Sequence, residues 1–158
     1  MTTPAIVPTG YLGTSNDFLH AKVDRSGAVR KVTGSVSIPA ATATNAIVGL
    51  VPFRKGAKFD YGSRVYSDDL DTSTNVTLNI GYVYDDNVTY TDATDAFVAA
   101  STTPQTGGMI EMTAKTGMTW TASADGWIVG KFLAATTTTG LLTFNLGIAY
   151  DPSGVTNP

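Results

Sequence analysis

The segment Asn75-Val-Thr-Leu-Asn-Ile-Gly-Tyr-Val-Tyr84 alternates large apolar residues with smaller or polar ones. The large residues are Val76, Leu78, Ile80, Tyr82 and Tyr84. Because successive side chains of a β-strand point to opposite faces, a period of two predicts a strand with one face in the core. We therefore expect Tyr82 and Tyr84, and likewise Tyr150, to serve in packing.

Other segments continue this pattern in both directions, with Gly, Pro, Asn and Asp as turn residues between them. The further strands expected are 32–38, 45–53, 57–61, 64–67, 109–113, 119–121, 127–135 and 141–150. We expect Thr136–Gly140 to join the last two as a hairpin, and Arg25–Ala28 to turn His20–Asp24 back onto the first. This number of short strands predicts a mostly β protein, either a two-sheet β-sandwich or a jelly roll.

One short helix is predicted, over Asp92–Ala100. Thr91 or Asp92 can cap its N-terminus, and acidic residues in the first turn suit the helix dipole. The segment Thr102–Gly108 contains a Pro and two Gly residues and ends this helix.

Both ends of the chain lack periodicity. Residues 1–17 are rich in Pro, Thr and Gly, and we interpret them as an extended N-terminal arm; residues 151–158 form a similar C-terminal tail. The 158-residue length suits a single domain, which we place at 18–150. Extended arms can add strands to a neighbouring molecule through backbone hydrogen bonds.

The composition excludes several classes of protein. The absence of Cys rules out disulfides and thiol catalysis, and a net charge of −3 without a basic cluster argues against a nucleic-acid partner. We find neither a signal peptide nor an apolar run long enough for a membrane span. Only 15% of the residues are charged, so such a surface can be buried against a partner without isolating many charges.

Few residues offer chemistry. His20 and Asp17 lack an accompanying nucleophile motif, so we expect no enzyme and no cofactor. Asp68, Asp69 and Asp71 are weak candidates for calcium ligands, because carboxylate oxygens suit calcium but the EF-hand order is missing. Asp residues that bond their own backbone in a turn explain this group equally well.

Trp120 lies between Thr119 and Thr121 and is expected to be the more exposed of the two Trp residues. An exposed indole can stack on a sugar ring. A carbohydrate-binding, lectin-like module is therefore an alternative function for this chain.

Three segments resemble structural proteins of tailed bacteriophages, particularly capsid decoration (cement) proteins and other small virion proteins. They are Val51–Phe59, Asp68–Tyr82 and Ala124–Phe132, set in a chain that is rich in Thr, Ala and Gly. The resemblance implies a non-enzymatic protein on the capsid surface of the virion, made in the host cytoplasm. It implies binding to the major capsid protein lattice, with a homotrimer favoured and without nucleic acid or membrane.

We expect the N-terminal arm to contact the partner, through Pro4, Ile6, Val7, Pro8, Tyr11 and Leu12. A tail-tube or other minor virion protein is an alternative within the same class. A jelly-roll shell protein of a small virus fits less well, because the chain has no basic arm for packaging nucleic acid.

Overall fold

Strands dominate the computed structural model, which describes residues 30–60, 62–112 and 119–150. The strands are β1 (Arg30–Ile38), β2 (Ile47–Phe53), β3 (Ala57–Phe59), β4 (Arg64–Ser67), β5 (Leu78–Tyr84), β6 (Ala93–Ser101), β7 (Gly108–Glu111), β8 (Gly126–Phe132) and β9 (Gly140–Tyr150). A single 3₁₀ turn, η1 (Thr103–Gln105), is the helical element of the described residues. The mostly β prediction is therefore confirmed.

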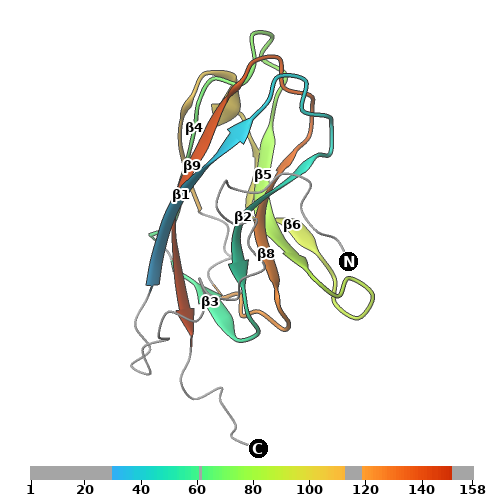
Figure 1. Cartoon of the computed structure of the whole chain (residues 1–158), viewed down its shortest axis with the longest axis vertical. Coiled ribbons are helices and arrows are strands. Elements are labelled where there is room, and N and C mark those ends of the chain that lie inside the picture. The colour runs from blue at the N-terminus through green and yellow to red at the C-terminus, as the bar shows by residue number, and fades with distance from the viewer. Residues whose placement is uncertain (1–29, 61, 113–118, 151–158) are drawn as a thin grey trace, which may run out of the picture.

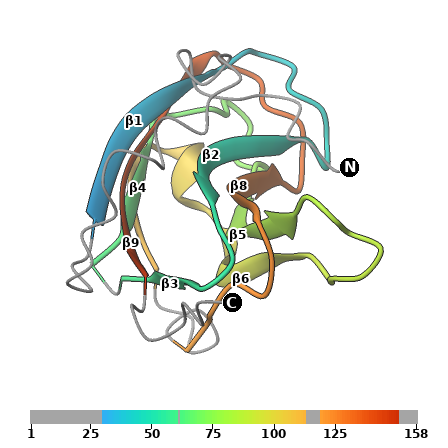
Figure 2. The same cartoon turned by 60° about the horizontal axis from the view of Figure 1, so that its bottom comes forward.

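The strands form two antiparallel sheets packed face to face (Figures 1 and 2). The first sheet has the order β1-β9-β4-β7, with β3 also paired to β9. The second sheet has the order β2-β8-β5-β6. The predicted two-sheet β-sandwich is thus the observed architecture.

The core lies between the inner faces of the two sheets. Alternate residues of β5 and β9 enter it as the sequence pattern predicts, and the largest fully buried side chains include Leu78, Ile80, Leu142, Phe144 and Leu146. The intervening residues of β9 point the other way, and Leu141, Thr143 and Asn145 among them are exposed. Period-two alternation thus decides which side chains of β9 are available at the surface.

The helix predicted over Asp92–Ala100 is wrong, because this segment is strand β6. The strand pairs with β5 across Ile80 and Val98 and buries Phe97 in the core. Asp92 does not cap a helix but accepts a hydrogen bond from the Tyr84 N–H at 2.8 Å. A nine-residue helix is marginal without packing, so cross-strand pairing overrides local capping signals here.

The hairpin predicted from 127–135 and 141–150 is also wrong, because β8 and β9 belong to different sheets. Their connection pairs with the connection from β1 to β2. Thr136 N–H donates to the Thr42 carbonyl at 3.1 Å, and its hydroxyl donates to the Pro39 carbonyl at 2.9 Å. Two chain crossings between the sheets therefore lie side by side and satisfy each other's polar groups.

The strand expected at 119–121 is reduced to an isolated bridge between Thr121 and Lys58. The turn at 25–28, the strand at 20–24 and both terminal arms lie outside the described residues. Among the described residues, no helix has the length and apolarity that a membrane crossing requires.

Candidate interaction surface

The outer face of the first sheet is open to solvent. Strand alternation places Val65, Ile110 and Leu142 in the core, and the residues beside them face outward. The exposed residues of this face are Lys31, Thr33, Ser35, Ser37, Lys58, Arg64, Tyr66, Met109, Glu111, Leu141, Thr143 and Asn145. In Figure 2 the strands β1, β9 and β4 form a curved wall whose outer side turns away from the second sheet.

Large hydrophobic side chains gather on this face. Of five exposed large hydrophobic residues among those described, three lie here: Tyr66 (51% exposed), Met109 (52%) and Leu141 (43%). Tyr66 is directly opposite Met109 on β7 and opposite Thr143 on β9. Leu141 is two residues from Thr143, a diagonal position that long side chains span. We call Tyr66, Met109 and Leu141 the first-sheet patch.

The charges beside the patch cancel. Arg64 Nη2 lies 3.4 Å from Glu111 Oε1, on paired positions of β4 and β7, and both side chains are 56% exposed. Such a pair contributes only about 0–1 kcal/mol to stability. The pair neutralises the two charges next to the patch, and Lys31 and Lys58 add positive charge farther along the same face, opposite Gly147 and Ala149 of β9.

The loop after β4 borders the patch and is organised by Asp71, which is 2% exposed. One carboxylate oxygen accepts the N–H (2.9 Å) and hydroxyl (2.7 Å) of Ser73 and the hydroxyl of Thr137 (3.0 Å). The other accepts the N–H groups of Asn75 and Val76. The Ser73 hydroxyl above all, and then these backbone donors, hold the pKa of Asp71 far below its usual range.

The carboxylates of the other two calcium candidates also accept hydrogen bonds from the backbone. Asp69 accepts the Asp71 N–H at 3.1 Å, and Asp68 accepts the Leu141 N–H at 2.8 Å. Within residues 30–60, 62–112 and 119–150, no group of three or more His, Cys, Asp or Glu side chains is arranged to hold a metal ion. Asp69 and Asp71 act as turn-forming groups, and Asp68 ties the loop to the edge of the patch.

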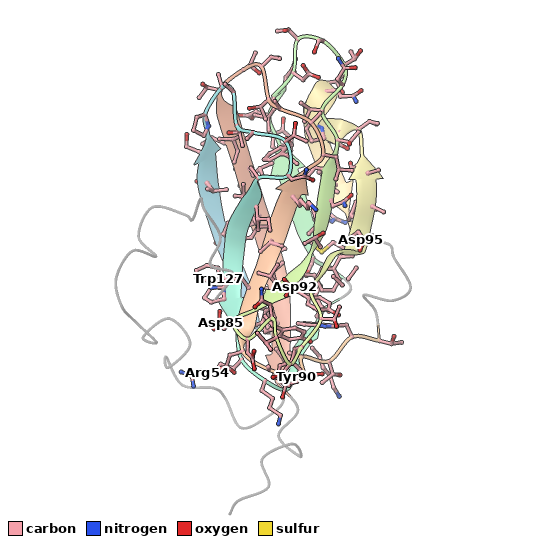
Figure 3. The ribbon with its side chains drawn as sticks, turned by 90° about the vertical axis from the view of Figure 1, so that its right-hand side faces the viewer. Arg54, Asp85, Tyr90, Asp92, Asp95 and Trp127 are labelled. Carbon is pink, nitrogen blue, oxygen red and sulfur yellow. The ribbon has the colours of Figure 1, made fainter. Side chains whose placement is uncertain are left out.

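The outer face of the second sheet has a different character. Val83 and Val129 lie on this face and are 1% and 0% exposed. Figure 3 shows Asp85, Asp92 and Trp127 near one another toward the end of this sheet. Partial burial of its carboxyl, and then the negative charge of Asp125, raises the pKa of Asp85. The second face is thus covered in part and acidic at one end.

The prediction that Trp120 is an exposed aromatic is wrong. Its ring stacks on Tyr82 at 4.9 Å and meets the edge of Phe53 at 5.0 Å, packed against the core. Its indole N–H is buried and has no hydrogen-bond partner in the part of the chain that the structure describes. Tyr84 is buried and Tyr82 half-buried in this same cluster, as predicted. These aromatic residues fill the sandwich and leave no sugar-stacking platform at Trp120.

The remaining predicted residues cannot be placed. His20 and Asp17 lie outside the described residues. So do the partner-binding residues of the arm, Pro4, Ile6, Val7, Pro8, Tyr11 and Leu12. The patch residues were not singled out from the sequence, although the alternation that buries Leu142 and Phe144 leaves Leu141 on the outside.

Comparison with known proteins gives no matching family model and no matching curated protein. Solved structures do match. A chain in the capsid of Ralstonia phage GP4 is 22% identical with a TM-score of 0.63, over 78% of this chain and 85% of that chain. A chain in the capsid asymmetric unit of cyanophage Pam1 is 22% identical with a TM-score of 0.60, over 78% of this chain and 86% of that one. These likenesses show a shared fold.

Proposed function

We propose that this chain is a non-enzymatic virion structural protein that decorates and stabilises a phage capsid by binding the major capsid protein lattice. The observation that carries the proposal is the shared fold: 78% of the chain superposes on chains from two phage capsids. The resemblance of Val51–Phe59, Asp68–Tyr82 and Ala124–Phe132 to decoration proteins supports it from the sequence.

The surface of the sandwich suits this role. A decorating subunit binds many equivalent positions and needs no catalytic site, and the first sheet offers an exposed face with an apolar patch beside a closed ion pair. Modest contacts suffice when many are made at once, because multivalent binding multiplies their strengths. A rigid sandwich adds stiffness to the shell that it covers.

The N-terminal arm, residues 1–17, is proposed as a second contact with the lattice, through Pro4, Ile6, Val7, Pro8, Tyr11 and Leu12. Deleting residues 1–17 should abolish binding to capsid shells that lack this protein, while circular dichroism and the melting temperature stay unchanged. Co-sedimentation with the shells measures the binding. Equal binding by the truncated and full-length proteins would remove the arm from the proposal.

A homotrimer at threefold positions of the shell is the assembly we favour. Native mass spectrometry of the purified protein checks this state directly. A ring of six copies would instead favour the alternative of a tail-tube protein.

A further inference from the structure

We propose that the first-sheet patch is the surface of this chain that seats on the capsid shell, in addition to the N-terminal arm. This inference rests on the proposed function and specifies which face of the sandwich is buried. Its occupant is the repeating surface of the major capsid protein.

Exposure and composition single out this face. Tyr66 and Met109 are half-exposed on adjacent strands, and Tyr, Met and Arg are enriched in the cores of protein interfaces. The other two exposed large hydrophobic residues of the described chain, Val88 and Leu133, lie singly elsewhere. Single exposed apolar residues are ordinary, whereas a cluster of them on one face marks a contact site.

The distribution of charged side chains also favours the patch as the contact surface. Beside the patch lie the closed ion pair Arg64–Glu111, the Asp68 carboxylate that accepts the Leu141 N–H, and Ser, Thr and Asn side chains. Lys31 and Lys58 lie farther along the same face. The charged groups next to the patch are already paired or hydrogen-bonded, so burying the patch carries a small desolvation cost. Contact through the end of the second sheet would instead bury Asp85 and Asp125; partial burial, and then the charge of Asp125, already raises the pKa of Asp85.

Size favours a lattice over a second free copy as the occupant. The five strands of this sheet, β1, β3, β4, β7 and β9, have 9, 3, 4, 4 and 11 residues. At about 3.4 Å per residue and about 4.8 Å between strands, the face projects an area of roughly 500 Å². A standard interface takes about 800 Å² from each partner, so this face alone would hold two free copies together only weakly. On a shell, the same small contact is repeated and reinforced by the arm.

The test replaces the two most exposed patch residues, as Tyr66→Ser combined with Met109→Ser. Val88→Ser is the matched control, because Val88 is 93% exposed and lies in the β5–β6 loop. Binding to shells that lack this protein is measured by co-sedimentation. We expect the double variant to bind on the order of tenfold more weakly or worse, since truncated interface anchors commonly have effects of this size. The control should bind like the wild type.

A second variant guards against misfolding. Thr143→Lys adds bulk and charge at the centre of the face without removing any core contact, because Thr143 is exposed and opposite Tyr66. It should also lose binding while keeping the wild-type melting temperature. Wild-type binding by both variants would overturn the inference and leave the proposed function intact.

Two further outcomes are decisive. If the wild type itself does not bind shells, the proposed function fails, and this inference fails with it. If the wild type is a stable oligomer that Tyr66→Ser with Met109→Ser dissociates, the patch joins copies of this chain and the shell is the wrong occupant.

Discussion

The outer faces of the two sheets differ, although their inner faces form one common core. On the first sheet, Tyr66 is 51% exposed at the centre of an open face. On the second, Val83 and Val129 are 1% and 0% exposed. A Cβ atom on Gly81, which pairs with Val129, would lie 2.0 Å from the Ala93 carbonyl oxygen. The start of β6 therefore covers the outer side of β5 at this point.

This difference shows that one alternating pattern can produce two kinds of surface. Strands on both sheets have outward-facing residues, but among the described strands the repeated register shifts occur at β6, an edge strand of the second sheet. The shifts between β5 and β6 bring the Ala93–Asp95 backbone over Gly81. A regular sheet stays open for a partner, whereas an irregular edge strand covers its neighbour.

The largest loss of stability is expected at Gly81, where β6 covers the outer side of β5. Gly81→Ala should destabilise the protein by about 3 kcal/mol or more, because its methyl group would meet the Ala93 carbonyl oxygen at 2.0 Å and the Asp95 nitrogen at 2.7 Å. Thermal unfolding should show a melting temperature lower by on the order of 10 °C.

Gly62→Ala is the matched control for this change. The nearest atom to its added methyl group is Asp60 Oδ2 at 3.5 Å, so its melting temperature should stay close to that of the wild type. Equal melting temperatures for Gly81→Ala and the wild type would contradict the close cover of β5 by β6.

A smaller loss of stability is expected from a substitution in the loop that borders the open face of the first sheet. Asp71→Asn places an amide NH₂ where the native oxygen accepts hydrogen bonds, so donors would face donors at Ser73 or at Asn75 and Val76. The melting temperature should fall by on the order of 5 °C. Asp69→Asn keeps an acceptor for the single Asp71 N–H and should have little effect.

The same carboxylate predicts a pH dependence. The folded state lowers the pKa of Asp71 below the value of about 3.9 that an unfolded chain has. Its stabilising contribution is therefore complete above about pH 4 and is lost as the pH falls through the folded-state pKa. Chemical denaturation from pH 7 to pH 2 should show the gap between wild type and Asp71→Asn narrowing in acid. A constant gap would mean that the carboxylate charge is not what the loop requires.

A paired substitution compares the two faces directly. Val129→Thr puts a hydroxyl at a fully buried position and should cost about 1–3 kcal/mol, whereas Leu141→Thr, at 43% exposure, should stay within about 0.5 kcal/mol. Urea unfolding measures both values. Similar costs at the two positions would mean that the outer faces are not distinct in the way described.

The sequence predicts the inner faces well and the cross-sheet connections poorly. The alternation of Leu142, Phe144 and Leu146 is enough to place β9 in the core, since a strand with one buried face has a period of two. This alternation does not say which strands pair with β9. The turn-like segment Thr136–Gly140 predicts a hairpin, but hydrogen bonds between Thr136 and residues Pro39 and Thr42 direct the chain to the other sheet.

The candidate surface was predictable only in part. Outward positions such as Leu141 and Tyr66 follow from alternation, yet their meeting requires the register of β4 with both β7 and β9. Trp120 shows the opposite case, because its Thr neighbours indicate exposure while contacts with Phe53 and Tyr82, distant in sequence, pack it against the core. Long-range pairing, which local sequence does not express, decides both outcomes.

The most direct test of the account is a cryo-electron microscopy reconstruction of capsid shells saturated with this protein. The account predicts added density for the chain at regular positions of the shell, with the outer face of the first sheet and its patch, Tyr66, Met109 and Leu141, turned toward the major capsid protein. Density with this face turned to solvent, or shells without added density, would contradict it.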